Sequence, residues 1–286
     1  MEHYRLEEIA DGVLAAIARP GGGGRGNAGV VRLDGETLVF DTGMTPQAGE
    51  ELRSAAGVLG PVRWVVNSHW HADHIRGNQA FASAEIVATT RTKELIETRA
   101  EAQLAEHKAT DVDAVLASFA EDQAVRDAHD KSFEDRVEEV RHMASTIAEV
   151  RLQPPTRTFE SRLELAPGCE LVTLGGGHTE SDAFLVLAER RVAVLGDLLC
   201  VDMHPWMGHG DPERWIEILG ELETLDVDGF VPGHGRVATV ADVRALREHL
   251  LTFLADPDTI ESRYPEWDFW GDTAERNRTF LRERAR

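Results

Sequence analysis

A short segment with the sequence His-Trp-His-Ala-Asp-His carries an unusual density of side chains that bind metal ions. It places three imidazoles and one carboxylate within six positions, at His69, His71, Asp73 and His74. Imidazole nitrogen and carboxylate oxygen suit zinc and neighbouring divalent ions, whereas closed structural zinc sites usually use cysteine, which this segment lacks. The segment therefore predicts a catalytic metal site.

The residues before this segment indicate how it is held. Residues 62–66 contain three valines and a tryptophan, an apolar and β-branched composition that predicts a buried strand ending just before the histidines. Alternate residues of an extended chain point the same way, so His69 and His71 can bind one ion from the same side. Asp73 and His74 follow where the chain turns, so we expect them to serve a second ion close by.

Three more candidate ligands each follow a strand-like apolar stretch further along the chain. His178 comes after a run of three glycines, Asp197 comes directly after Gly196, and His234 lies between two glycines. Glycine lets the backbone approach a metal ion closely. Because each candidate follows the end of a predicted strand, we expect the ligands to converge at one edge of a sheet or sandwich, where Asp197 could bridge two ions.

With these motifs the chain resembles the metallo-β-lactamase-fold hydrolases, which include glyoxalase II-like and lactonase-like enzymes. Their pattern is His-x-His-x-Asp-His followed by a His, an Asp and a His on later strands, and the similarity runs from Asn-Ala-Gly at residues 27–29 to Pro-Gly-His-Gly at residues 232–235. The resemblance implies an α/β protein with the αββα four-layer sandwich. It also implies one ion on His69, His71 and His178, a second on Asp73, His74 and His234, and Asp197 as the bridge.

Asp41 lies where this family has a carboxylate that orients the histidine segment, and such groups fix the tautomer and basicity of ligands. A turn-forming aspartate before Thr-Gly is the alternative interpretation, and the two roles are compatible.

The resemblance implies two Zn²⁺ ions, with iron or manganese as alternatives because the same ligands hold all three. Bound ions lower the pKa of water from about 15.7 to near 7, so we expect a metal-bound hydroxide to attack the carbonyl of an ester, thioester or lactone. Asp73 is the predicted catalytic residue, since it can orient the hydroxide. Promiscuous β-lactamase activity is compatible with this chemistry.

Two other functions remain alternatives: a dedicated β-lactamase, and an iron-loaded oxidoreductase that uses the same ligands. Asp197 is typical of glyoxalase II-like and lactonase-like members, whereas zinc β-lactamases have cysteine or another residue there, which disfavours the first. Redox members commonly carry a flavin or rubredoxin module, and the sequence contains none.

Composition limits the partners that we expect. The chain has 286 residues, 42% of them hydrophobic, and a formal net charge of −21, which disfavours nucleic acid because phosphate contacts use Lys and Arg. We expect a small-molecule substrate and no membrane span. Its polar start, which lacks a signal-like apolar stretch, and its two widely spaced cysteines, Cys169 and Cys200, favour a cytoplasmic protein.

We expect one domain over residues 1–286, with two sheet-rich halves and outer helices at residues 46–56, 212–225 and 242–254. Residues 92–150 lack glycine and proline and repeat apolar residues at helical spacing, which predicts an inserted group of helices that acts as a lid, a homodimer interface or solvated decoration. The glycine run at residues 21–26 predicts a flap over the metals or an exposed linker.

Two segments are expected to complete the pocket or the core. The loop at residues 203–207 should lie near the metals, so His204, Trp206 and Met207 are candidate pocket residues, with packing on the core as the alternative. The tail over residues 260–286 is aromatic at Tyr264, Trp267, Phe269 and Trp270, and we expect it to dock on the domain.

Overall fold

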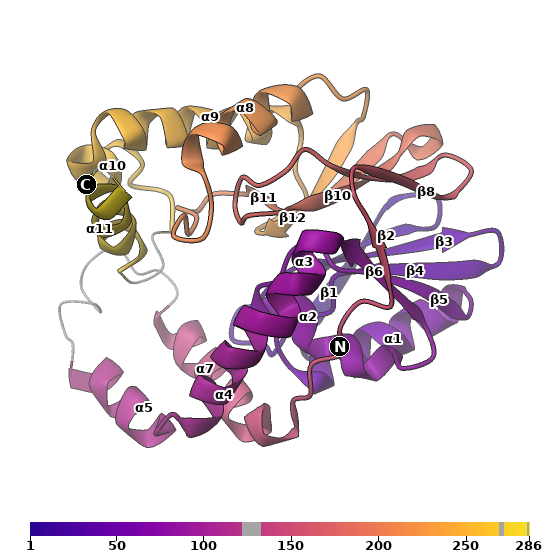
Figure 1. Cartoon of the computed structure of the whole chain (residues 1–286), viewed down its shortest axis with the longest axis horizontal. Coiled ribbons are helices and arrows are strands. Elements are labelled where there is room, and N and C mark those ends of the chain that lie inside the picture. The colour runs from indigo at the N-terminus through magenta and orange to yellow at the C-terminus, as the bar shows by residue number, and fades with distance from the viewer. Residues whose placement is uncertain (122–132, 269–271, 285) are drawn as a thin grey trace.

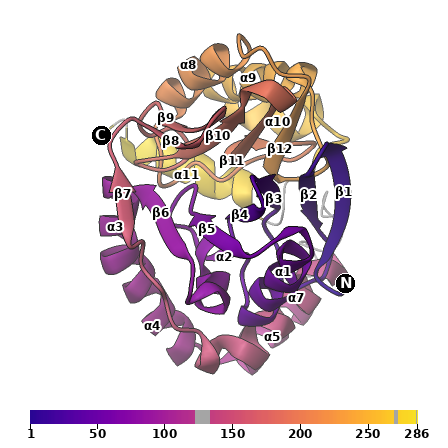
Figure 2. The same cartoon turned by 90° about the vertical axis from the view of Figure 1, so that its right-hand side faces the viewer.

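The computed structural model describes residues 1–121, 133–268, 272–284 and 286 (Figure 1). Within these residues the strands form a seven-stranded sheet in the order β1-β2-β3-β4-β5-β6-β7 and a five-stranded sheet in the order β12-β11-β10-β9-β8. Figure 2 shows the two sheets stacked between outer helices. The αββα sandwich expected from the sequence is therefore confirmed.

The first sheet begins as an antiparallel meander, β1 to β4, and continues with parallel strands that alternate with helices along the chain. Its two outermost strands were not predicted from the sequence, because the first is an edge strand with one fully buried residue and two adjacent glutamates, and the last has only three residues. The strands are β1 (Tyr4–Ala10), β2 (Val13–Ala18), β3 (Ala28–Leu33), β4 (Glu36–Phe40), β5 (Val62–Val66), β6 (Glu85–Thr89) and β7 (Arg157–Phe159).

The second sheet contains β8 (Arg162–Ala166), β9 (Cys169–Thr173), β10 (Ala183–Leu187), β11 (Val192–Cys200) and β12 (Gly229–His234). The prediction that the fourth of these strands ends before Asp197 is wrong, because its parallel pairing with β12 resumes beyond Gly196 after a shift in register. Gly196 has a φ of 53°, and a Cβ there would lie 2.7 Å from the side chain of Ser68. Only glycine allows the two sheets to approach this closely beside the candidate metal ligand.

Three apolar layers hold the sandwich together. The central layer lies between the sheets and includes Phe40, Leu171 and Val194. The helix α1 (Pro46–Leu59) covers the outer face of the first sheet, while α8 (Pro212–Leu222) and α9 (Val240–Ala255) cover the second. α1 and α8 begin where the sequence predicts, since the side chain of Thr45 caps α1 and that of Asp211 caps α8. α9 begins two residues before its predicted start at residue 242.

Between β6 and β7 the described chain is helical over residues 90–109, 112–121 and 133–149, and an irregular segment at residues 150–156 leads into β7. Residues 122–132 of the predicted insertion lie outside the described residues. Both cysteines are buried and free. No helix in the described ranges is long and apolar enough to cross a membrane. The helices of the insertion are α3 (Thr90–Leu95), α4 (Glu101–Ala109), α5 (Val112–Glu121) and α7 (Phe133–Thr146).

The C-terminal tail docks on the second sheet's helical layer and ends in two helices, α10 (Ile260–Arg263) and α11 (Thr273–Arg284). Tyr264 and Trp267 pack against the core cluster there, and Trp267 stacks on the ring of His249. The other two aromatic residues of the predicted tail, Phe269 and Trp270, lie outside the described residues.

Candidate metal centre

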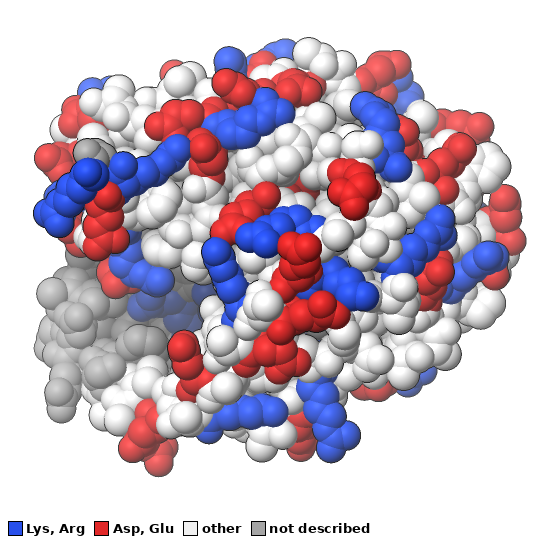
Figure 3. All heavy atoms as spheres, viewed as in Figure 1, with Lys and Arg blue, Asp and Glu red and all other residues white. Residues whose placement is uncertain are grey.

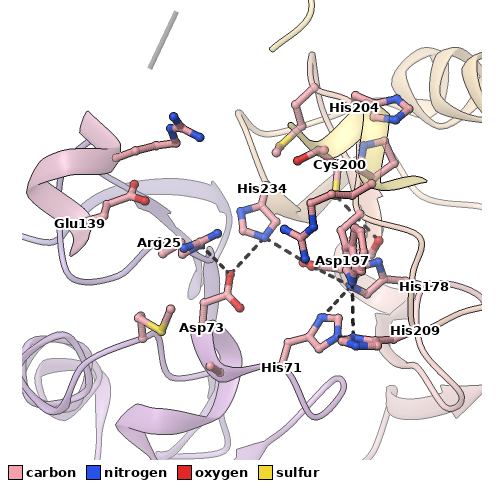
Figure 4. Close-up of a pocket in the computed structure, with 18 of the residues that line it drawn as sticks. Arg25, His71, Asp73, Glu139, His178, Asp197, Cys200, His204, His209 and His234 are labelled. Atoms are coloured by element: carbon pink, nitrogen blue, oxygen red, sulfur yellow. Dashed lines mark hydrogen bonds and ion pairs between the residues drawn. The ribbon is translucent and has the colours of Figure 1, made fainter. Parts of the chain in front are cut away.

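Seven histidine and aspartate side chains from five segments meet at one end of the sandwich. Figure 4 shows those that border the cavity: His71, Asp73, His178, Asp197 and His234. Both sheets contribute, so residues that are far apart in the sequence become neighbours. His69 and His71 lie after β5, Asp73 and His74 lie in the short helix α2 (Ala72–Ile75), His178 lies between β9 and β10, Asp197 lies in β11, and His234 ends β12.

These side chains form two groups in which the candidate ligand atoms all lie within 4.8 Å of one another. Oδ2 of Asp197 is 3.2 Å from Nε2 of His178 in one group, and its Oδ1 is 3.1 Å from Nε2 of His74 in the other, so this carboxylate faces both groups. The division matches the one implied by the sequence resemblance, and the ligand roles stay a prediction. The groups are His69, His71, His178 and Asp197, and then Asp73, His74 and His234.

Asp41 orients two of the histidines. Its Oδ2 lies 2.9 Å from Nδ1 of His74 and accepts a hydrogen bond from the hydroxyl of Ser68 at 2.7 Å. Since that hydroxyl donates to Asp41, it accepts the proton of Nδ1 of His69, 2.8 Å away. Both rings are therefore protonated at Nδ1 and turn Nε2 toward the centre.

The Nε2 atoms of His69 and His74 and Oδ1 of Asp197 are buried without a hydrogen-bond partner in the described part of the chain. Buried polar atoms rarely lack partners, so three such atoms side by side form a donor set that a cation would satisfy. Burial disfavours a charged His74 ring, but the nearby carboxylates, Asp197 above all, outweigh this and raise its pKa well above the usual value. The pocket thus attracts a positive charge to Nε2 of His74, which a metal ion can supply.

His209 orients the ring of His71 and was not predicted from the sequence. Its Nδ1 lies 2.8 Å from Nε2 of His71 and also accepts a hydrogen bond from the indole of Trp206 at 3.5 Å. Because an indole can only donate, Nδ1 of His209 is an acceptor and His71 carries its proton on Nε2. The remaining nitrogen of His71, Nδ1, faces Nε2 of His178 at 3.0 Å.

Asp182 fixes the loop that presents His178. Its carboxylate accepts hydrogen bonds from the backbone N–H of Gly177 at 2.8 Å and from the hydroxyl of Thr179 at 2.7 Å, so the backbone on both sides of the histidine is held. Gly210 approaches the same loop so closely that a Cβ would lie 2.1 Å from the carbonyl oxygen of Gly177. A buried carboxylate and close backbone packing together position the third histidine.

The protonation states suit a cation. Burial, together with the neighbouring histidines, lowers the pKa of His69 and His71 well below the usual value, so both rings are neutral ligands at pH 7. Burial alone would raise the pKa of Asp73, but the positive charges of His74, Arg25 and His234 lower it to about 2. Neighbouring carboxylates raise the pKa of His74 and His234 instead, so a bound cation would replace the protons on these two rings. Imidazole nitrogen together with ionised carboxylate is a donor set that fits two zinc ions or related divalent metals.

A cavity of about 490 Å³ opens above this centre. Its walls include Arg25 from the glycine-rich loop, Glu139 from α7 and Arg276 from α11, so the inserted helices and the tail both enclose it. The glycine-rich loop lies directly on the centre, since a Cβ on Gly26 would lie 2.8 Å from the ring of His74.

The three candidate pocket residues have different positions. Trp206 lines the cavity, and His204 borders it while its ring nitrogens contact His249 and Asn277. The prediction for Met207 is wrong: its side chain is fully buried in the core beside α8, because the loop turns inward at that point.

Several further residues hold the site and were not identified from the sequence. Ser68 and His209 orient ligands, Asp182 holds the third histidine, and Glu139 and Arg276 line the cavity. Ser68 and Asp182 adjoin the histidine motifs, and that proximity was the available signal. His209 and Arg276 had no such signal, because their contacts exist only in the folded chain.

Comparison with known proteins agrees with this geometry. A family model described as the metallo-beta-lactamase superfamily matches residues 21–234. No curated protein matches the chain.

Several solved structures share the fold. A metallo-beta-lactamase from Hirschia baltica has 16% identity and a TM-score of 0.61, covering 86% of this chain and 97% of the other. The structure of VMB-1 has 16% identity and a TM-score of 0.63, covering 89% and 99%. FIM-1 from Pseudomonas aeruginosa, solved in its mono-zinc form, has 15% identity and a TM-score of 0.59, covering 86% and 95%. With the family match, these findings establish that the chain belongs to the metallo-beta-lactamase superfamily of metal-dependent hydrolases.

Proposed function

We propose that this protein is a dinuclear zinc hydrolase that cleaves the acyl bond of an ester, thioester or lactone. The observation that carries the proposal is a cluster of buried acceptor atoms: Nε2 of His69 and of His74 and Oδ1 of Asp197 have no hydrogen-bond partner within the described residues. Asp197 also lines the cavity, so the cluster lies directly beside it. Hydrogen bonds to Ser68, His209 and Asp41 hold the protons of His69, His71 and His74, respectively, away from the centre.

When bound, two zinc ions acidify a coordinated water and polarise the substrate carbonyl. Asp73 would orient the attacking water by accepting a hydrogen bond from it, because its pKa of about 2 keeps it ionised and its carboxylate borders the cavity. Arg25, whose Nε is 3.6 Å from Oδ2 of Asp73, holds that carboxylate in place.

The choice of an acyl substrate is supported by the bridging position of Asp197, which the resemblance associates with glyoxalase II-like and lactonase-like enzymes. Iron or manganese could occupy the same ligands, so the metal itself is part of the proposal.

The test is metal content per chain, measured by plasma mass spectrometry on protein purified without added metal, followed by assays on thioesters, lactones and β-lactams. We expect near two zinc ions and hydrolysis of at least one acyl class other than the β-lactams. Iron without hydrolysis would favour the oxidoreductase alternative, and hydrolysis of β-lactams alone would favour the dedicated lactamase.

Two variants locate the ions. Changing both His69 and His71 to Ala should remove about one ion and the activity while the fold survives, because both side chains lie outside the strands. Asp197→Asn should lower occupancy of both ions. Asp202→Asn is the control, since Asp202 is an exposed aspartate only five residues further along the chain. Full occupancy and activity in the Asp197 variant would contradict the bridging role.

A further inference from the structure

The C-terminal helix α11 carries several arginines, and all but one of those described are neutralised by acidic neighbours. Arg278 pairs with Glu261, Arg282 pairs with Glu275 at 3.2 Å, and Arg284 pairs with Asp211 at 3.0 Å. Such pairing is expected in a chain with 51 acidic and 30 basic side chains, and Figure 3 shows acidic and basic groups lying side by side over one face of the molecule.

Arg276 is the exception on this helix. It makes no ion pair with any described residue; its guanidinium carbon instead lies 4.3 Å from the centre of the Trp206 ring, and both residues line the cavity above the metal centre. An arginine stacked on an aromatic ring keeps its N–H edge available for a bidentate contact with a carboxylate. The stacked ring also removes water from one face of the cation, which strengthens its attraction for an anion.

Asn277, the next residue along α11, anchors this arginine. Its side chain is fully buried, donates a hydrogen bond to the carbonyl of Pro205 at 2.8 Å and accepts one from the N–H of Met207 at 3.0 Å. These bonds connect α11 to the residues immediately before and after Trp206 in the chain. They therefore fix the backbone of Arg276 relative to that of Trp206, which holds the stack in place.

The same stack is connected to the candidate metal ligands. The indole N–H of Trp206 reaches Nδ1 of His209, and this nitrogen also contacts His71. An anion on Arg276 would thus lie within the cavity but to one side of the metals. That position suits a charged group elsewhere in the substrate rather than its reacting carbonyl.

We propose that Arg276 is a specificity-determining residue that binds a carboxylate of the substrate, so that the preferred substrates are acyl compounds carrying a second, anionic carboxylate group. This inference rests on the proposed hydrolase function. Arg25 also borders the cavity, but it faces Asp73 and therefore serves the metal side.

The experiment uses two esters that differ only in charge: mono-4-nitrophenyl glutarate and its methyl ester. The zinc-loaded wild type should prefer the charged ester. Arg276→Gln should lower kcat/KM for that ester by about 10- to 100-fold, mostly through KM, since hydrogen bonds to charged groups contribute about 1.5–3 kcal/mol. The neutral ester should be hydrolysed as before, and Arg276→Lys should restore part of the preference.

Arg282→Gln is the matched control, because Arg282 lies on the same helix with its side chain 60% exposed. It should leave both esters unaffected. Equal use of the two esters by the wild type, or an unchanged preference in Arg276→Gln, would overturn the inference while leaving the hydrolase intact.

Binding of glutarate itself, followed by calorimetry, separates the two proposals. If no ester is hydrolysed, the proposed function fails, and glutarate binding alone then tests whether Arg276 binds a carboxylate. Binding that is lost in Arg276→Gln and kept in Arg282→Gln supports it, whereas no binding to the wild type, or equal binding to all variants, contradicts it.

Discussion

Asp41→Asn is the sharpest test of how the histidines are oriented. Oδ1 of Asp41 accepts the N–H of Ser68 at 2.8 Å, and Asn retains this acceptor. The substitution places an NH₂ group where Oδ2 now accepts two donors, the hydroxyl of Ser68 and the ring N–H of His74. Asn is nearly the same size and tolerates the positive φ of 61° at this position, so the backbone is not strained further.

The new NH₂ group can only donate, which inverts both proton chains. His74 must then accept a hydrogen bond at Nδ1 and carry its proton on Nε2. The hydroxyl of Ser68 must donate to Nδ1 of His69, so His69 also carries its proton on Nε2. Two candidate ligand atoms, one in each group, then carry a proton that the metal ion must displace. Changes to residues that orient ligands cost about 10- to 100-fold in metal affinity, which is about 1.4–2.8 kcal/mol per ion.

The assay is a competition titration of the metal-free protein with zinc and a chromophoric chelator, which resolves the two ions. Asp34→Asn is the control, because Asp34 also has a positive φ, of 47°, but lies exposed in the turn between β3 and β4. Urea unfolding of both metal-free variants checks the fold. Zinc affinities within twofold of the wild type at both positions would refute the proposed orientation of the histidines.

Three further perturbations address the glycine-rich loop at residues 21–26, the inserted helix α7 and the metal ions. Gly26→Ala should lower zinc affinity by about tenfold or more in the same titration, because the added Cβ would lie 2.8 Å from the ring of His74. Gly57→Ala is the control: its Cβ would have no neighbour within 4 Å, so it should leave zinc affinity unchanged. It should also stabilise α1 by about 0.5–1 kcal/mol. Burial raises the pKa of Glu139 from 4.5 to about 7, so the metal-free protein should lose up to about 3 kcal/mol of stability as the pH rises through this range. Glu139→Gln should flatten that dependence in urea unfolding at pH 5 and pH 8, and identical profiles would contradict it. Removal of zinc with a chelator should lower the melting temperature, since free zinc at 100 times Kd stabilises the folded chain by about 2.7 kcal/mol per site. An unchanged melting temperature would contradict zinc binding to the folded chain.

Most regular elements could be predicted because their signals are local. The apolar stretches of β2 to β6 and β8 to β10 alternate or run continuously between turn residues, and α1 and α8 have a capping residue followed by proline at the helix start. The edge strand β1 was missed because only one of its residues, Tyr4, is fully buried, so its sequence resembles an exposed segment. The end of β11 was misplaced because Gly196 looks like a terminator, whereas pairing with β12 carries the strand past it.

The candidate ligands were evident in the sequence because neither a packed core nor a solvated surface needs three histidines and an aspartate within six positions. By itself the sequence therefore determined the family, the fold class and the set of side chains able to bind metal. Only the tertiary structure decided which atoms of those side chains face the centre, because ring tautomers depend on partners such as Asp41 and His209 that come from other segments. It also decided that Met207 packs in the core while Arg276 faces the cavity, since long-range contacts, rather than the local residue pattern, set the direction in which each of these side chains points.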